Sequence, residues 1–474
     1  MAQQMAWTLQ PKQLMPEFGA RLFPGLRKHQ RLATWAAVLL TLAVLSLTWL
    51  HGRHAAAFVA YPHDIAQASF AAAGDVIPHQ AVRSAAAAAG PGVQGWSALF
   101  SDVTDVFQSA DFGFVNMETP VAPAHSHGSK PFMFDAPLAL PEALKANGIK
   151  IVSFANNHVM DQGWAGFAET RQHLREIGLQ FAGTGDTAQQ AWQPVIVQAN
   201  GIKVGFLGIT RWLNGNRNPD DPSQPHVNFF PYPDSSAESA GPSHPDPATK
   251  DEAGVIQAVQ QARTQCDFLV VSIHWGIEYA PAPRPQDVEL AHKIMEAGAS
   301  VILGHHPHVL QPIETYRTSD GRNTVIFYSL GNFLSNQSRT YVDGLMPDKQ
   351  GDPRDSMIVL FSAVKKDYGP AGTRIELGHV GILPVWGENN RNDLASGKAK
   401  TPVIHPVLID REIPLVQARL DQLNKLPQPL TGDQKQEFIA VTTRLKLLDD
   451  RRQQILARTG DEYVTTPPKL SVKP

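Results

Sequence analysis

The sequence predicts an α/β fold, and three observations support this prediction. Short apolar runs of strand length alternate along the chain with longer segments of helical spacing, as in folds whose helices pack on a sheet. Several runs end in acidic residues, asparagine or histidine, and the ligand sites of open α/β sheets lie at the carboxyl ends of strands. With 474 residues, of which 43% are hydrophobic, the chain can bury at least one large core.

The composition narrows the possible classes of function. The formal net charge is -3, and this balance argues against a nucleic-acid partner. Cys266 is the single cysteine, so an intramolecular disulfide and a multi-cysteine metal site are excluded. It lies just before the apolar run 268–272, and we expect it to be an ordinary core residue.

An apolar stretch near the amino terminus predicts a membrane anchor. Residues 32–50 are uncharged and just long enough to span a bilayer as a helix. Trp35 and Trp49 lie near the two ends of this stretch, and basic residues are concentrated before it, which predicts a cytoplasmic amino terminus. A cleaved signal peptide, with the alanines at 55–57 as its site, and a buried globular helix are the alternatives. The predicted segments are a cytoplasmic tail (1–31), a single-pass signal anchor in the cell membrane (32–50), a linker (51–67) and an extracytoplasmic remainder.

Three predicted strands in the first part of the chain end in polar residues. These strands and the residues that follow or end them are 68–74 with Asp75, 112–118 with Glu118, and 149–155 with Asn157, His158 and Asp161. Taken alone, Asp75 is more typical of a helix cap, and Glu118 of a surface residue. The recurrence of polar residues at strand ends is the reason to expect a shared site.

Two later strands lead into histidines. Residues 268–273 are followed by His274. Residues 301–304 form an apolar run that is predicted to stop at Gly304, and the turn after it holds His305, His306 and His308. Pro307 fixes the backbone between the last two imidazoles, which are good ligands for zinc, iron, manganese or nickel. A loop of hydrogen-bonding histidines is the alternative.

The remaining segments complete the α/β pattern. We expect a hairpin around Asn200-Gly201, a strong turn dipeptide, and a long surface loop over residues 212–250. The other predicted elements are an alanine-rich insert (81–95), helices (96–110, 163–177, 251–265, 286–297, 413–426, 431–458), a short strand and loop (179–185) and strands (324–329, 357–364, 373–383).

Five strand ends would therefore gather carboxylates, an asparagine and several imidazoles at one sheet edge. This is the ligand set of a two-metal hydrolytic site, in which the metals lie about 3.5–4 Å apart and generate hydroxide at neutral pH. A coincidence of unrelated helix caps and core histidines is the alternative.

The same motifs, in the same order, resemble the CapA family of poly-gamma-glutamate capsule biosynthesis proteins, which is itself similar to the calcineurin-like metallophosphatases. The resemblance covers roughly residues 68–385. It implies a four-layer α/β/β/α sandwich of the metallophosphatase type, followed by a C-terminal helical extension over residues 386–474. The matching motifs are Gly74-Asp75, Asn116-Met-Glu118, Ala155-Asn-Asn-His158 with Asp161 and Gly163, 201–208, His274-Trp-Gly-Ile-Glu-Tyr279, Gly304-His-His-Pro-His-Val309 and Tyr328-Ser-Leu-Gly-Asn-Phe333.

The resemblance also implies a role for each site residue. His158 resembles the histidine that meets the leaving group of the substrate, and Asp161 would orient it. The implied metal ligands are Glu118 as the bridging acid, Asp75 and His308 on one metal, and Asn157, His274 and His306 on the other. Glu278 and Asn332 are predicted to contact substrate, with an outer position around the metals as the alternative for Glu278.

The chain departs from the phosphatase pattern at two positions. Ile77 stands two residues after Asp75, where phosphatases have a histidine, and the nearest imidazole is His79. The bridging acid is Glu118 rather than an aspartate. The number of divalent metals, one or two, therefore stays open, with manganese, zinc and iron as the expected ions.

These observations lead to three hypotheses about function. The first is a membrane-anchored, extracytoplasmic, metal-dependent hydrolase of a polyanionic envelope polymer, whose scissile bond is an amide or a phosphoester. The second is a non-catalytic membrane subunit that works with capsule synthesis or export proteins. The third, a cytoplasmic phosphatase, conflicts with the predicted anchor.

Overall fold

The computed structural model describes residues 33, 35–49, 62–232 and 249–466. The chain divides into two compact units, residues 1–63 with 368–370, and residues 64–367 with 371–474. In the first unit, residues 33 and 35–49 are helical. No helix among the described residues is both long and apolar enough to cross a membrane, so the predicted span over residues 32–50 lacks support. The predicted tail (1–31) lies outside the described residues, as do residues 51–61 of the predicted linker.

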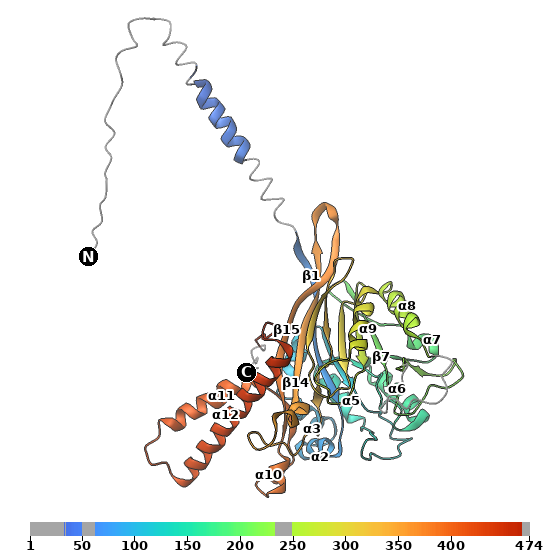
Figure 1. Cartoon of the computed structure of the whole chain (residues 1–474), viewed down its shortest axis with the longest axis vertical. Helices are drawn as coiled ribbons and strands as arrows, with labels where there is room; N and C mark the ends of the chain where they lie inside the picture. The colour runs from blue at the N-terminus through green and yellow to red at the C-terminus, as the bar shows by residue number, and fades with distance from the viewer. Residues whose placement is uncertain (1–32, 34, 50–61, 233–248, 467–474) are drawn as a thin grey trace, which may run out of the picture. The chain divides into compact units, whose positions relative to one another are not determined.

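The second unit contains two large mixed sheets with helices around them (Figure 1). The first sheet has eight strands in the order β16-β15-β14-β1-β2-β3-β4, and β13 pairs with β1. Strands β1, β2, β3, β4 and β13 run parallel, whereas β14, β15 and β16 are joined in antiparallel pairs. The strands are β1 (His63–Val76), β2 (Phe112–Met117), β3 (Ile149–Ser153), β4 (Gln180–Ala182), β13 (Asn332–Leu334), β14 (Asp355–Asp367), β15 (Thr373–Asn389) and β16 (Ile404–Leu408).

The second sheet has six strands in the order β11-β12-β10-β9-β7-β6. Its four inner strands are parallel, and the two edge strands are antiparallel to their neighbours. The predicted hairpin joins β6 to β7, and Asn200 and Gly201 at its tip have φ angles of 51° and 76°, as a tight two-residue turn requires. The strands are β6 (Val195–Ala199), β7 (Ile202–Thr210), β9 (Phe268–His274), β10 (Val301–His305), β11 (Ile313–Arg317) and β12 (Asn323–Phe327). A separate pair is formed by β5 (Thr184–Gly185) and β8 (His226–Val227).

Three apolar cores set the order of the layers. The middle core joins the two sheets face to face, and the rings of Phe114 in β2 and Phe206 in β7 lie 5.8 Å apart there. A second core packs helices on the outer face of the first sheet, and a third packs helices on the outer face of the second. The layers therefore run helices, sheet, sheet, helices, and the α/β prediction is confirmed.

The helices largely follow the predicted spacing. The helix α6 (Gly163–Ile177) begins and ends at the predicted residues. The N-cap of α8 is Asp251, whose side chain accepts a hydrogen bond from the Gly254 amide. The helices of the two outer layers and of the loops between them are α2 (Gln80–Ala89), α3 (Gly92–Ala98), α4 (Thr104–Ser109), α5 (Ala139–Ala146), α7 (Ala188–Ala191), α8 (Glu252–Arg263), α9 (Pro285–Glu296) and α10 (Arg391–Ala395).

Two segments between β1 and β2 have structure that the predictions did not give. The alanine-rich segment predicted as an insert is helical, as α2 and the start of α3, because alanine is the strongest helix former and its small side chain packs closely on the sheet. The single helix predicted over residues 96–110 is broken between Ala98 and Thr104 into α3 and α4. Buried Leu99, Phe100 and Val103 occupy this break, so core packing overrides helical continuity there.

The long loop predicted over residues 212–250 is only partly described. Residues 213–232 contain no regular element apart from the short strand β8, which agrees with the prediction. Residues 233–248 lie outside the described part of the chain.

Gly304 lies inside β10 instead of ending it. Strand pairing continues through His305, and the positive φ angles fall later, at His306 (95°) and His308 (57°). Glycine is needed at residue 304 because a Cβ there would lie 2.0 Å from the carbonyl oxygen of Tyr328. The predicted turn glycine is thus a glycine of close backbone approach.

This contact predicts the effect of Gly304→Ala. The added methyl group meets backbone rather than a movable side chain, so we expect a loss of about 1–3 kcal/mol in the free energy of unfolding. Gly432→Ala is the matched control, because nothing lies within 4 Å of its Cβ position. Urea unfolding followed by tryptophan fluorescence measures both variants. Equal midpoints for the two variants would contradict the close approach.

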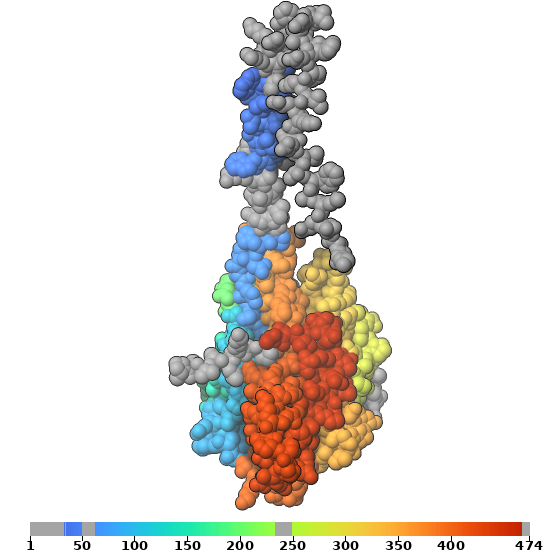
Figure 2. All heavy atoms as spheres, turned by 90° about the vertical axis from the view of Figure 1, so that its left-hand side faces the viewer, coloured from blue at the N-terminus to red at the C-terminus, as the bar shows by residue number. Residues whose placement is uncertain are grey.

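Two long helices complete the carboxyl-terminal part. α11 (Ile409–Asn424) and α12 (Gly432–Thr459) pack against each other, and both contact β15. A capping box of Thr431 and Gln434 starts α12. Figure 2 shows these helices, in orange to red, over one face of the second unit. The sheet itself continues past residue 385, since β15 runs to Asn389 and β16 pairs with it.

Candidate metal centre

The ends of parallel strands from both sheets meet at one site. In the first sheet, Asp75 of β1 pairs with Asn116 of β2, and Asn116 pairs with Ser153 of β3. In the second sheet, His274 of β9 pairs with His305 of β10. The carboxyl ends of the strands therefore lie together in each sheet, and the face-to-face packing of the sheets joins the two sets. Every predicted site residue is buried except Glu278, which is exposed.

Glu118 lies at the centre of this site. Its Oε1 is 3.9 Å from His158 Nε2, 3.8 Å from His274 Nε2 and 3.9 Å from His308 Nε2. The side chain is fully buried, and no hydrogen-bond donor reaches Oε1 from the described residues. A buried carboxylate oxygen without a partner costs about 1–3 kcal/mol or more. Three imidazole nitrogens surround this oxygen, and a cation bound beside it would supply the missing partner.

Asp75 is held by the histidine turn of the second sheet. His308 Nδ1 lies 3.1 Å from Asp75 Oδ2, and His305 Nδ1 lies 3.2 Å from Asp75 Oδ1. The backbone amide of His306 also donates to Oδ2 at 3.4 Å. With His308 Nδ1 facing the carboxylate, its Nε2 is turned toward Glu118. Asp75 thus fixes which ring nitrogen of His308 is free to bind a metal.

Two asparagines hold the carboxylates of Asp75 and Glu118 in place. Asn116 donates through Nδ2 to Asp75 Oδ1 at 2.8 Å and to Glu118 Oε2 at 3.2 Å. Asn156 donates to Asn116 Oδ1 at 3.2 Å and to the Met117 carbonyl at 2.9 Å. The Oε2 atom of Glu118 is therefore satisfied, and Oε1 alone is left facing the imidazoles.

His158 is oriented by Asp161, as predicted. His158 Nδ1 lies 2.8 Å from Asp161 Oδ2, which also accepts a hydrogen bond from the Phe134 amide at 2.6 Å. The ring packs on Phe134, with centroids 4.4 Å apart. With Nδ1 directed to the carboxylate, the Nε2 atom of His158 points into the site and can exchange a proton there.

Burial and neighbouring charges shift the protonation of the site. Burial raises the pKa of the Glu118 carboxyl well above its usual value, and the Asp75 carboxylate adds to the rise. Burial also acts to raise the pKa of Asp75, but hydrogen bonds to His305 and His308 outweigh it and lower that pKa well below normal. Burial, followed by the charge of a neighbouring histidine, lowers the pKa of His274 well below normal and that of His306 to about 3. The last two imidazoles are therefore neutral at neutral pH, with a lone pair available for a metal.

The unpartnered atoms fit a divalent metal. Among the described residues, Glu118 Oε1, His274 Nδ1 and His306 Nδ1 are buried without a hydrogen-bond partner. Two groups of side chains bring ligand atoms within 4.8 Å of one another, Asp75 with Glu118 and His308, and Glu278 with His306 and His308. The two groups share His308. Asn157 Oδ1 joins the cluster through His274 Nε2, 2.9 Å away.

Asn332 and Glu278 lie in different environments. The Asn332 side chain is buried, and its Nδ2 lies 3.2 Å from the His308 carbonyl and 2.9 Å from the Pro353 carbonyl. These contacts hold the histidine turn in place. Glu278 reaches the metal-binding group from the exposed side, so it can meet a metal or a substrate.

A cavity of about 570 Å³ opens over the site. It is lined by His127, Phe132, Met133, Asn157, His158, Met160, Asp161, Gly163, Asn214, Asn216 and Glu278. His158 and Glu278 therefore line the same cavity.

Comparison with known proteins identifies the family. The family described as "Bacterial capsule synthesis protein PGA_cap" matches residues 69–337, which include all the strand ends of the site. The chain belongs to this family. The predicted membership of the CapA family is thus confirmed.

Three relatives illustrate the similarity. The PGA biosynthesis protein CapA of Bacillus subtilis is 28% identical over 312 residues, covering 65% of this chain and 70% of that protein. The capsule biosynthesis protein CapA of Bacillus anthracis is 27% identical over 320 residues, covering 66% and 71%. A Mycobacterium tuberculosis protein described as a probable polyglutamine synthesis accessory protein is 28% identical over 217 residues, covering 44% and 53%.

In this member of the PGA_cap family, sequence reasoning missed the supporting residues of the site. Asn116 and Asn156 stood inside the quoted motifs, and His305 inside the histidine turn, but none of them was given a role. Their position at strand ends was the available signal. His79 is not among the close contacts of Glu118, and its Nδ1 accepts a hydrogen bond from the Asn336 amide at 3.2 Å.

Proposed function

We propose that this chain is a metal-dependent hydrolase of a polyanionic cell-envelope polymer, in the biosynthesis of a poly-gamma-glutamate type capsule or exopolymer. One observation carries the proposal: the partnerless, buried Oε1 of Glu118 is ringed by three imidazole nitrogens at 3.8–3.9 Å. A site of this kind is unfavourable for the bare fold and favourable once a cation neutralises it. The relatives named as a PGA biosynthesis protein and a capsule biosynthesis protein support the class of polymer.

The residues that would hold metal are those whose carboxylate, amide and imidazole groups meet at the strand ends. They are Asp75, Glu118, Asn157, His274, His306 and His308, with Glu278 as a further ligand on the exposed side. A divalent cation such as manganese, zinc or iron would supply Lewis-acid polarisation of a substrate oxygen and a water acidic enough to attack at neutral pH. Asn116 and Asn156 keep the two carboxylates in place, so that the ligand set is preorganised.

The protein side of the reaction rests on His158. The Asp161 carboxylate holds its Nδ1 and stabilises the protonated ring, which leaves the Nε2 proton for a leaving group. The leaving group would occupy the open cavity between His158 and Glu278. This arrangement serves an amide or a phosphoester equally, because either leaving atom needs a proton.

Elemental analysis of the purified full-length chain tests the proposal. We expect one or two equivalents of a transition metal in the wild type, and at least about a hundredfold weaker metal binding in Glu118→Gln, since even supporting residues of metal sites contribute 10–100-fold. Glu142→Gln makes the same chemical change on an exposed helix position and should keep the wild-type metal content. Absence of metal from wild type refolded with manganese, zinc and iron in turn would overturn the proposal.

We further propose that the enzyme works outside the cytoplasm, at the cell membrane and beside other capsule synthesis or export proteins. The apolar stretch 32–50 and the basic residues before it support this location. Reporter fusions at residue 30 and at the carboxyl terminus test it. Activity of an extracytoplasmic reporter at the amino-terminal position would contradict the orientation.

A second proposal is a non-catalytic role in polymer assembly. The description of the Mycobacterium tuberculosis relative as an accessory protein and the presence of Ile77 at a phosphatase ligand position favour it. Normal polymer export in a strain that carries both Glu118→Gln and His158→Gln would support this role over the enzyme.

A further inference from the structure

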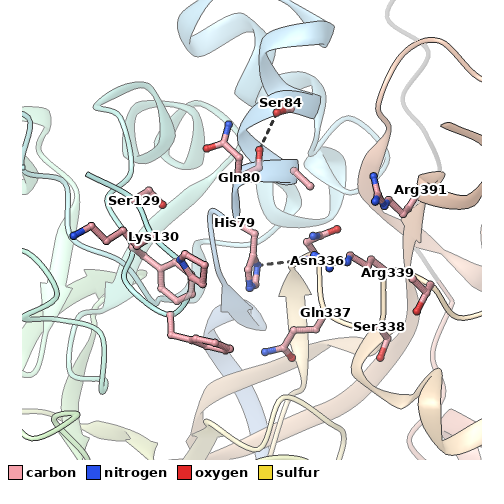
Figure 3. Close-up of a pocket in the computed structure, with 15 residues that line it drawn as sticks. His79, Gln80, Ser84, Ser129, Lys130, Asn336, Gln337, Ser338, Arg339 and Arg391 are labelled. Atoms are coloured by element: carbon pink, nitrogen blue, oxygen red, sulfur yellow. Dashed lines mark hydrogen bonds between the residues drawn. The ribbon is translucent and has the colours of Figure 1, made fainter. Parts of the chain in front are cut away.

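A second cavity lies beside the metal centre. It has a volume of about 850 Å³ and lies between the start of α2, the loop 129–134 and the loop 336–340 (Figure 3). His79 lies in the middle of the view, with Lys130 on one side and Arg339 and Arg391 on the other. The loop 336–340 is joined to the metal centre, since Asn332, which holds the His308 carbonyl, also donates to Gln337 Oε1 at 2.9 Å.

The charge in this cavity is of one sign. Lys130, Arg339 and Arg391 are exposed, and none of them forms an ion pair with a carboxylate in the described part of the chain. The lining residues in that part include no aspartate or glutamate, and the others are polar, alanine, proline or aromatic. Three cations around one hollow, with no carboxylate among the described lining residues, favour an anionic ligand.

An exposed aromatic residue connects the two cavities. Phe132 lines both of them and is 84% exposed. It lies at the tip of a two-residue turn closed by mutual backbone hydrogen bonds between Lys130 and Met133, and its φ angle of 63° is unfavourable for a residue with a side chain. Such exposure and strain are typical of ligand-contacting loops. Below it, Phe134 contacts both His79 and His158, with ring centroids 5.2 and 4.4 Å away.

We propose that this cavity is a subsite that holds carboxylates of a polycarboxylate chain, away from the bond at the metal centre. Successive carboxylates of the polymer bind to Arg339, Arg391 and Lys130. Phe132 packs on the apolar part of the polymer chain that passes between the two cavities. The inference rests on the proposed function for the place of the reacting bond, but the subsite acts in binding alone. A polymer that fits this subsite carries repeated negative charges, which lie on both sides of Phe132 when it is bound.

A binding measurement tests the subsite. The probe is fluorescein-labelled oligo-gamma-glutamate of about ten residues, titrated with the detergent-solubilised full-length chain and followed by fluorescence anisotropy. For Arg339→Gln with Arg391→Gln we expect about tenfold weaker binding and a shallower dependence on salt, because two ion contacts are lost. The control is Lys425→Gln with Lys435→Gln, an equal change of net charge on exposed helix-end positions, which should stay within about twofold of wild type.

The outcomes separate this inference from the hydrolase proposal. If the arginine pair binds the probe as tightly as the lysine control, the subsite is wrong whatever the metal content. If the wild type holds metal but does not bind the probe, the subsite also fails while the hydrolase proposal stands. If Glu118→Gln loses metal but still binds the probe, and the arginine pair binds it about tenfold more weakly, the subsite stands without any enzymatic activity. An inorganic polyphosphate of equal charge that binds more than about tenfold tighter than the probe would overturn the carboxylate class.

Discussion

Replacing His158 by glutamine is expected to lower kcat by about 10²–10⁴-fold with little change in metal content. The factor is that of a general acid or base held in position. Glutamine keeps the size and polarity of the side chain but has no proton to give at neutral pH. His158 Nε2 is 3.9 Å from Glu118 Oε1, so this ring can deliver a proton beside the proposed metal ligands.

Initial rates measure this effect on whichever of two probes the wild type cleaves, poly-gamma-glutamate or bis-p-nitrophenyl phosphate. Asp161→Asn is the companion variant, since it keeps a hydrogen-bond partner near His158 Nδ1 but removes the charge that stabilises the protonated ring. We expect a smaller loss for it, about 10–100-fold, as for other residues that support a catalytic group from behind. A His158→Gln enzyme with wild-type kcat and wild-type metal would remove His158 from the mechanism.

Local sequence patterns were enough to predict the strands and the centre of the site. Asp75, Glu118 and His274 each end or follow a short apolar run, and His308 lies in the turn after another; parallel strands place such residues at the same edge of a sheet. The hairpin at Asn200-Gly201 and the helix over residues 163–177 were equally readable, because each depends on a turn dipeptide or on a spacing within a few residues. The resemblance to a family then supplied the order of layers.

Features that depend on contacts far apart in the sequence were not predictable. Gly304 read as a turn residue, although its small size is required by the Tyr328 carbonyl just after the neighbouring strand β12. The cationic cavity combines Lys130 with Arg339 and Arg391, which have no local pattern in common. The alanine-rich segment was misread because composition alone does not reveal that a sheet lies beneath it. Local periodicity therefore predicts elements, whereas subsites require the tertiary structure.

Arg451→Met is expected to destabilise the fold by about 3–5 kcal/mol, the usual cost of breaking a buried ion pair on one side. Arg451 of α12 is 1% exposed, and it donates through Nε to Asp355 Oδ1 at 2.9 Å and through Nη2 to Asp352 Oδ1 at 3.1 Å. Methionine fills much of the same volume but leaves the buried Asp355 carboxylate without its counter-charge, while Asp352 keeps its ion pair with Arg458. Between those carboxylates lies Pro353, whose carbonyl anchors the amide of Asn332 beside the histidine turn.

The pH dependence of this loss identifies its electrostatic origin. Burial raises the pKa of Asp355 from 3.8 to about 6, although Arg451 opposes the rise. A carboxyl whose pKa is raised on folding binds its proton more tightly in the folded state, so its contribution to stability falls as pH rises from 3.8 through 6. Without Arg451 the pKa of Asp355 rises further, and we expect the Arg451→Met variant to lose more stability at pH 8 than at pH 5.

Thermal midpoints at both pH values measure this difference, with Arg451→Met combined with Asp355→Asn as the control. The double variant should recover part of the lost stability at pH 8, because asparagine carries no charge to bury. A loss of equal size at both pH values, with no recovery in the double variant, would mean that Arg451 acts through packing rather than charge.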